Sequence, residues 1–267
     1  MKQPIGIIGT GNVGSVLAKR LVALGYPVKA TNSRGPGSMH AFAAETGTKA
    51  VSLDDITQEV DMLILAIPFG RISEVSRGLQ LPEKIIVVDA SNYYPDRDGA
   101  IRPVDQGLPE SVWTAQQLAH PVVKAFNSIM AYSLDHNASS GQVDHRIALP
   151  VSGDDPLARA TVGALVKALG FASYDAGGLA ASWRQQPGQP AYCTDASLDE
   201  LPVLLSKANP TRAAQRRDQA VQAMARLPST FPPQKLIRVS RLSAGLDRFK
   251  WSSWSALIHL GYSLLRA

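Results

Sequence analysis

The sequence has 267 residues, of which 45% are hydrophobic and 18% charged, and its formal net charge is +5. This balance excludes wholesale disorder, and the length suggests one large domain or two modest ones. The single cysteine, Cys193, excludes an internal disulfide framework and favours a reducing compartment, while the histidines show no metal-ligand spacing. We therefore expect no metal site.

The N-terminal residues lead straight into a short apolar run at residues 5–8. We find no secretory signal and no stretch of 18 consecutive apolar residues. These observations predict a cytoplasmic protein without a membrane span.

Short β-branched runs alternate with helical stretches over residues 1–180. Nearly continuous apolar runs, such as the one at 62–67, are typical of strands that are buried on both faces. The expected strands are 5–8, 28–31, 49–51, 62–67, 85–89, 122–126, 147–151 and 171–174, and the clearest helices are 12–24, 38–46 and 156–169. The alternation predicts an α/β fold with a doubly wound, mainly parallel, Rossmann-like sheet.

Two stretches interrupt this pattern. Residues 91–110 contain three prolines and lack clear periodicity, so we interpret them as an irregular flap or lid near the site. The turn-rich segment 184–190 marks the best boundary. We therefore expect a nucleotide-binding domain at 1–180 and a small, mostly helical C-terminal extension at 181–267, with a helix beginning at Asn209-Pro210 and ending near Arg226.

The C-terminal residues 251–267 predict a helix with an apolar stripe on one face, formed by Trp251, Trp254, Ile258, Tyr262 and Leu265. Our first expectation is that this stripe packs on the chain's own core. A subunit interface and an interfacial membrane helix are the alternatives. We expect the protein to be a homodimer.

A glycine-rich turn carries the clearest functional signal. The motif G-x-G-x-x-G follows the first expected strand and opens the first expected helix, as a dinucleotide-binding fingerprint requires. In such a turn the glycines allow a sharp bend and a close backbone approach, and the helix N-terminus offers free N–H groups to a pyrophosphate. The predicted cofactor-binding residues here are Gly9, Thr10, Gly11, Asn12, Val13 and Gly14.

The end of the second expected strand indicates which nucleotide binds. NAD enzymes usually have an acidic residue there to bind the ribose 2′-hydroxyl, but this chain has Asn32, Ser33 and Arg34. A hydroxyl donor and a guanidinium suit a 2′-phosphate better. The sequence therefore predicts NADP(H) rather than NAD(H).

Further candidate site residues follow other strands, at the edge of the sheet where such folds bind ligands. Ala66, Ile67 and Pro68 could form an apolar shelf under the ribose and the nicotinamide. Ser91, Asn92 and Asn127 could hydrogen-bond the carboxamide or the electron acceptor, although a capping or turn role is equally compatible with each of them.

Several segments together resemble one known family, the coenzyme F420:NADPH (deazaflavin-dependent NADP) oxidoreductases. The resemblance covers residues 1–180 and rests on segments 7–14, 32–34, 65–68, 88–92, 123–127, 151–155 and 175–179. It implies hydride transfer between NADP(H) and a planar small-molecule acceptor, such as deazaflavin F420 or a flavin. Since the cofactors carry such chemistry, it implies no catalytic acid–base side chain, and we find no convincing candidate.

Two alternatives remain open. A 3-hydroxyacid or imine reductase resembles this domain at its N-terminus and would use a proton donor, for which Lys124 is the candidate. A non-catalytic NADP sensor or interaction protein is the other. Residues 181–267 carry 12 basic and 5 acidic residues, which could attract an anionic partner, but no nucleic-acid-binding motif accompanies them. We therefore expect no nucleic-acid partner.

Overall fold

The structure is a computed structural model that describes residues 2–139 and 146–265. Within these residues, six strands form one parallel sheet in the order β3-β2-β1-β4-β5-β6, which confirms the predicted doubly wound architecture. The strands are β1 (Ile5–Ile8), β2 (Val28–Thr31), β3 (Lys49–Ala50), β4 (Met62–Leu65), β5 (Ile86–Asp89) and β6 (Val122–Lys124).

A second, two-stranded parallel sheet continues from the edge of the first. It consists of β7 (Ala148–Val151) and β8 (Ala172–Asp175). The two sheets meet at an antiparallel bridge, in which Lys124 and Ser152 exchange backbone hydrogen bonds of 2.7 and 3.0 Å. Strand β6 ends before the predicted residue 126 because Phe126 adopts a positive φ of 61°, which extended backbone does not allow.

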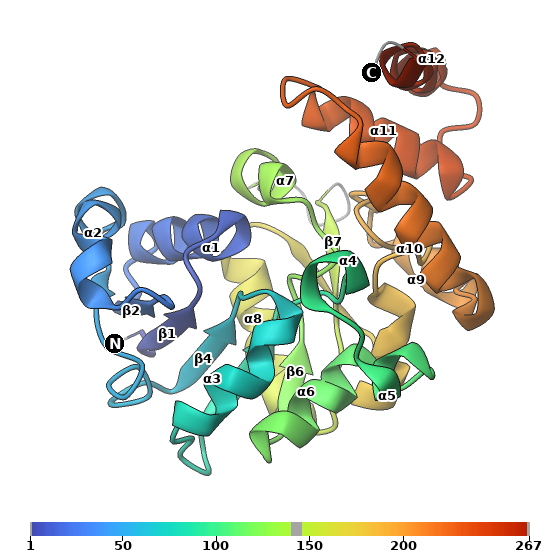
Figure 1. Ribbon diagram of the computed structural model, residues 1–267. Coiled ribbons are helices and arrows are strands. Elements are labelled where there is room, and N and C mark those ends of the chain that lie inside the picture. The colour runs from blue at the N-terminus through green and yellow to red at the C-terminus, as the bar shows by residue number, and fades with distance from the viewer. Residues whose placement is uncertain (1, 140–145, 266–267) are drawn as a thin grey trace.

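Helices cover both faces of the large sheet (Figure 1). Alternate strand residues point to opposite faces, so Ile7 packs with α1 (Asn12–Ala23) and α8 (Pro156–Ala168), whereas Ile8 packs on the side of α3 (Ile72–Gly78) and α6 (Glu110–Leu118). Further helices are α2 (His40–Thr46), α7 (Ala131–His136), α9 (Glu200–Ser206), α10 (Pro210–Ala225), α11 (Pro233–Ser243) and α12 (Trp251–Leu265), and the 3-10 turns include η1 (Pro36–Met39), η2 (Phe69–Arg71) and η4 (Leu179–Gln185).

Helices α8 and α10 each begin with a side chain that caps the helix N-terminus. The Asp155 carboxylate accepts the Leu157 N–H at 2.8 Å, and the Asn209 side-chain oxygen accepts the Thr211 N–H at 3.0 Å. In each case a proline follows the capping residue at the first helical position, where its missing N–H costs nothing.

The segment 91–110 is more ordered than the expected irregular flap. It contains two short helices, α4 (Pro95–Asp98) and α5 (Arg102–Asp105). Tyr93 is fully buried, packs against Phe69, and bonds through its hydroxyl to Gly99 and Asp105 at 3.0 and 2.9 Å. A buried aromatic anchor therefore ties this segment to η2. The sequence did not reveal α4 and α5 because four residues are too few to show helical periodicity.

The C-terminal helices extend away from the sheet, and α12 lies farthest from it, against α11 (Figure 1). The first expectation for the α12 stripe is wrong, because its five side chains are exposed rather than packed on the chain's own core. Among the described residues, the structure contains no helix that is both long and apolar enough to cross a membrane.

Candidate functional site

The glycine turn between β1 and α1 is built by close backbone contacts. A Cβ atom on Gly9, whose φ is +106°, would lie 2.3 Å from the Ala66 carbonyl oxygen, and one on Gly14 would lie 2.0 Å from the Gly9 carbonyl oxygen. These two positions therefore admit only glycine. At Gly11 a Cβ would meet nothing within 4 Å, so the space in front of this residue is open.

The N-terminus of α1 faces that open space. Gly11 is the N-cap residue, and no side chain caps the helix. Thr10 and Val13 are half-buried, while Gly11 and Asn12 are exposed. The first N–H groups of a helix have no partner within it, and the helix dipole adds a partial positive charge there. This turn is therefore a ready site for a phosphate group.

The loop after β2 is shaped by Asn32. Its side-chain oxygen accepts the Arg34 N–H at 2.9 Å and the Ser38 hydroxyl at 3.2 Å, and its amide nitrogen lies 3.4 Å from the Thr10 hydroxyl. Ser33 and Arg34 are exposed, and their side chains make no hydrogen bond or ion pair within the described parts of the chain. Asn32 thus links this loop to the glycine turn and leaves both neighbours available to a ligand.

The residues after β4 lie against the same turn. The Ala66 N–H donates to the Ile8 carbonyl at 2.8 Å, and Ile67 Cγ2 would be 3.0 Å from a Cβ on Gly9. Ala66 and Ile67 are half-buried and Pro68 is exposed. The structure therefore brings the predicted apolar shelf next to the glycine turn.

Asn92 and Asn127 pair with each other. Asn92 donates from its side chain to the Asn127 carbonyl at 2.9 Å, and the Asn127 amide donates to the Asn92 side-chain oxygen at 3.1 Å. Gln185 completes the arrangement by donating to the Asn127 side-chain oxygen at 2.9 Å, and it also accepts from the Ser152 hydroxyl at 2.9 Å. Sequence reasoning missed Gln185, which lies in η4, 58 residues after Asn127.

Two tyrosines extend this polar network. The hydroxyls of Tyr94 and Tyr192 are 2.7 Å apart, and the Asn92 amide donates to the Tyr192 hydroxyl at 3.3 Å. Burial raises the pKa of Tyr94 to about 12 and that of Tyr192 well above its ordinary value. Both phenols therefore stay protonated at neutral pH. Neither was singled out from the sequence, since nothing local distinguishes them from core tyrosines.

Below these residues lies a buried cluster of charges. The Lys124 ammonium is fully buried, donates to the Ser91 carbonyl at 2.6 Å, and lies 3.4 Å from Asp89 and 3.5 Å from Glu110. Asp89 also accepts the Ser91 N–H at 2.9 Å, the Ser91 hydroxyl and, at 2.6 Å, the Ser111 hydroxyl. Ser91 is thus fixed from several directions, and its hydroxyl points to Asp89.

The two carboxyl groups of the cluster differ in protonation. Burial raises the pKa of Asp89, but Lys124 and the serine hydrogen bonds outweigh this effect and hold the pKa below the ordinary range. Burial raises the pKa of Glu110 to about 7, and Lys124 only partly opposes it. At neutral pH Asp89 is therefore a carboxylate, whereas the Glu110 carboxyl group is near its titration midpoint.

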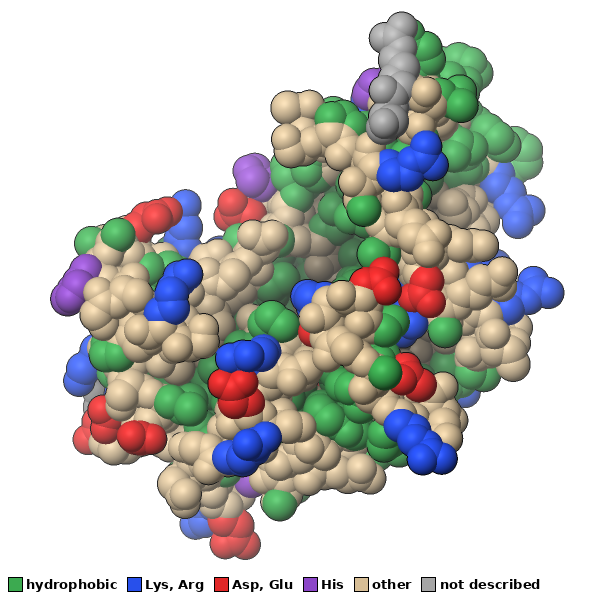
Figure 2. Space-filling model, viewed as in Figure 1, with side chains coloured by type: hydrophobic (Ala, Val, Ile, Leu, Met, Phe, Trp, Pro, Cys, Tyr) green, Lys and Arg blue, Asp and Glu red, His purple; other side chains and the backbone are tan. Residues whose placement is uncertain are grey.

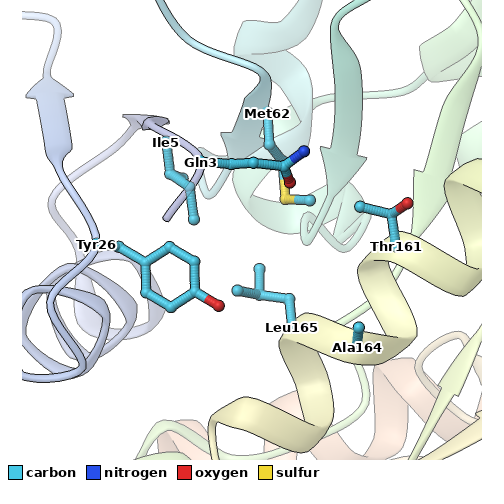
Figure 3. A pocket seen from close by; sticks show the side chains of 7 residues that line it. All are labelled: Gln3, Ile5, Tyr26, Met62, Thr161, Ala164 and Leu165. Atoms are coloured by element: carbon cyan, nitrogen blue, oxygen red, sulfur yellow. The ribbon is translucent and has the colours of Figure 1, made fainter. Parts of the chain in front are cut away.

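One small cavity lies away from these residues. It has a volume of about 120 Å³ and is lined by Gln3, Ile5, Tyr26, Met62, Thr161, Ala164 and Leu165 (Figure 3). Ile5 and Met62 begin their strands, so this cavity lies at the amino edge of the sheet, opposite the glycine turn. It is also smaller than the roughly 300–1,000 Å³ typical of small-molecule sites. His120 precedes β6 and therefore also lies toward the amino edge, away from the glycine turn.

Comparison with known proteins agrees with this architecture. The family model "NADP oxidoreductase, coenzyme F420-dependent" matches residues 4–93. The crystal structure of a hypothetical protein, SMa0349 from Sinorhizobium meliloti, is similar at 35% identity with a TM-score of 0.65, and the alignment covers 74% of this chain and 95% of that one. A second similar structure comes from Arthrobacter sp. FB24 and is named a putative F420-dependent NADP reductase. It is 24% identical with a TM-score of 0.56, and the alignment covers 68% of this chain and 88% of that one. At this identity the similarity supports the fold alone.

The curated relatives match over shorter parts. Metalloreductase STEAP3 of Rattus norvegicus is 29% identical over 179 residues, which is 67% of this chain and 34% of that protein. The Escherichia coli K12 protein YjhV is 42% identical over 62 residues, or 23% of this chain and 45% of that protein. The chain thus spans less than half the length of these curated relatives.

Proposed function

We propose that this chain transfers hydride between NADP(H) and a planar small-molecule acceptor, such as deazaflavin F420 or a flavin, because its residues 4–93 match the coenzyme F420-dependent NADP oxidoreductase model. The uncapped start of α1, with open space in front of Gly11, is the observation that carries the proposal. When bound, NADP(H) supplies or accepts the hydride, and the protein supplies position and exclusion of water.

Each group of residues then has a distinct task. The backbone N–H groups of residues 12–14 hold the pyrophosphate, and Ser33 and Arg34 bind the 2′-phosphate. Ile67 and Pro68 support the ribose and the nicotinamide. Asn92 and Asn127 form a rigid floor, where the second lone pair of the Asn92 side-chain oxygen can accept from the carboxamide.

The surroundings of Lys124 argue against a hydroxyacid reductase that uses this lysine as proton donor. Its ammonium is fully buried and already faces Ser91, Asp89 and Glu110. A donor must reach the substrate directly or through one water. Lys124 instead supports the backbone that leads to Asn92.

The Tyr94–Tyr192 pair favours a second candidate, the reduction of a carbonyl or imine acceptor. A protonated phenol beside Asn92 could donate the proton that such an acceptor needs after hydride transfer. In that case Tyr94→Phe would lower turnover of carbonyl or imine substrates at least 10²-fold, within the range for general acid catalysis, while NADPH affinity stays unchanged. Equal turnover of these substrates by the wild type and by Tyr94→Phe would exclude the tyrosine pair as proton donor.

Nucleotide binding is the first experiment. Calorimetry with NADPH and NADH should show a preference for NADPH in the wild type and a reversal of that preference in Arg34→Glu. Arg77→Glu, which introduces the same charge change at an exposed position of α3, is the matched control. If Arg34→Glu keeps the wild-type preference, the assignment of the 2′-phosphate site is wrong.

Acceptor choice is the second experiment. NADPH oxidation is measured without oxygen against deazaflavin F420, FMN, FAD, ferric chelates and quinones. We expect turnover with at least one planar acceptor. Tight NADPH binding without turnover of any of these, or of a 3-hydroxyacid or imine panel, would favour the non-catalytic sensor.

A further inference from the structure

Helix α12 turns its apolar side outward. Ser253 and Ala256 are buried, whereas the five residues that form the α12 stripe are exposed: Trp251 75%, Trp254 44%, Ile258 62%, Tyr262 50% and Leu265 88%. Figure 2 shows hydrophobic side chains gathered at the upper right of the molecule, where α12 lies. An isolated globular chain would normally place the small polar residues outside and the large apolar ones inside.

The stripe is large for an uncovered surface. From these exposed fractions, which refer to whole residues, the five residues together expose roughly 700 Å² of surface, polar and backbone atoms included. The largest apolar patch of a typical monomer covers about 300–600 Å², and a stable interface buries about 800 Å² on each partner. The α12 stripe is therefore close to the area that one side of a stable interface needs.

The spacing of the stripe is symmetric. Its successive members are three, four, four and three residues apart, so the pattern reads the same in both directions about Ile258. If two copies of α12 pack antiparallel about a two-fold axis at Ile258, Trp251 faces Leu265 and Trp254 faces Tyr262. A two-fold interface requires this kind of self-complementarity.

Small residues share the same symmetry. Ser255 and Gly261 are both exposed and lie three residues before and after Ile258. They would face each other across the axis, and a Cβ on Gly261 would meet nothing within 4 Å in the single chain. Small residues at such positions let two helix backbones approach closely without leaving space between the larger side chains.

The charge pattern favours a second copy over a lipid surface. Residues 251–265 contain no Asp, Glu, Lys or Arg, so two copies of the helix can meet without like-charge repulsion along its length. A helix that lies in a membrane interface instead carries Lys and Arg along its polar face. The polar face of α12 carries no Lys or Arg, and Ser253 on that face is buried.

We propose that α12 is a dimerisation helix, which packs antiparallel on α12 of a second copy of this chain with Ile258 at the two-fold axis. The proposal does not depend on which reaction the protein catalyses. It identifies the surface that forms the homodimer expected from the sequence.

Sedimentation equilibrium of Ile258→Glu tests the interface. The wild type should be a dimer at micromolar concentration, and the variant should dissociate at least about 100-fold more readily, because each dimer would bury two facing carboxylates. Leu157→Glu, which places the same charge at a 78%-exposed position on α8, should remain dimeric. Circular dichroism must show the same helix content in all three proteins. A wild-type monomer, or an Ile258→Glu dimer of unchanged affinity, would overturn the proposal.

Cross-linking tests the orientation. Under mild oxidation Ile258→Cys should form disulfide-linked dimers, because a residue on a two-fold axis meets its own copy. Trp251→Cys alone should not cross-link, but a mixture of Trp251→Cys and Leu265→Cys should. The wild type, which contains Cys193, gives the background. Cross-linking of Trp251→Cys to itself would indicate a parallel pair and refute the antiparallel arrangement.

Vesicle flotation tests whether a lipid surface, rather than a second copy of the chain, covers the α12 stripe. The wild type is mixed with vesicles of anionic phospholipid at low salt. A dimer that stays in solution supports the proposal. A monomeric protein that floats with the vesicles, and no longer does so as Ile258→Glu, would show that lipid covers the stripe and would overturn it.

Discussion

Replacing Glu110 with glutamine is expected to stabilise the protein at pH 8 and to leave its stability near pH 4.5 almost unchanged. Glu110 is 3% exposed and lies 3.5 Å from Lys124. Burial raises the pKa of Glu110 to about 7 in the folded protein, against 4.5 for an ordinary glutamate. Glutamine keeps nearly the same shape and has no proton to lose, so the substitution removes this difference.

The sign and size of the effect follow from the two pKa values. Between pH 4.5 and 7 the unfolded chain has lost the Glu110 proton while the folded protein retains it, so wild-type stability falls as the pH rises through this range. A difference of about 2.5 between the folded and unfolded pKa corresponds to about 3 kcal/mol. Since domains are stable by only about 5–15 kcal/mol, a change of this size is easily measured.

Urea unfolding at pH 4.5, 6, 7 and 8 is the assay. The gap in unfolding free energy between Glu110→Gln and the wild type should widen up to pH 7 and then stay constant. Glu83→Gln, which makes the same change at an exposed position, should follow the wild type. A gap that does not vary with pH would show that Glu110 titrates normally in the folded protein and would refute this reasoning.

Four further substitutions test other parts of the structure. Gly14→Ala should lower both the melting temperature and the affinity for NADPH, because its Cβ would lie 2.0 Å from a backbone oxygen. Gly11→Ala should weaken NADPH binding but leave the melting temperature unchanged, because a Cβ there meets no other atom within 4 Å. Equal melting temperatures for the two variants would contradict the close packing at Gly14. Lys124→Met should cost about 3–5 kcal/mol in urea unfolding, since it leaves Asp89 buried without its cation; a loss below 1 kcal/mol would count against a charged Asp89. Arg241→Met removes hydrogen bonds to Glu200 and Asp247 at 2.7–3.1 Å. The loss should speed proteolysis between α11 and α12. An unchanged cleavage rate would show that Arg241 does not hold this part of the chain in place.

The fold could be predicted because its signals are local. Apolar runs identified the strands of the parallel sheet, and the glycine turn at residues 9–14 identified where β1 passes into α1. The expected starts of the helices at 156 and 210 agree with the structure to the residue, and each is preceded by a side chain that caps the helix. Short helices such as α4 escaped detection because four residues give no periodicity.

The buried charge cluster could be predicted only in part. The expected strands 85–89 and 122–126 contain Asp89 and Lys124, but these two residues are 35 apart in the sequence, and nothing local shows that their side chains meet. Glu110 reads as an ordinary acidic residue in the first turn of a helix. Its burial depends on how α6 packs against the sheet, which is a property of the whole fold.

The α12 stripe shows a different limit. Its helical spacing was correctly recognised from the sequence, but the prediction that it packs on the chain's own core was wrong. Periodicity reveals which side chains share a face. It does not reveal what covers that face, because a core, a second subunit and a lipid surface all require the same apolar residues.

Gln185 has a consequence for shortened versions of this protein. Its side chain joins Asn127 to Ser152, although it comes from η4, well beyond the last strand of the large sheet. A fragment that stops before Gln185 would retain the glycine turn but leave those two side chains without this partner. Grafting or trimming experiments that seek a minimal nucleotide-binding unit should therefore cut the chain downstream of Tyr192, which also contacts Asn92.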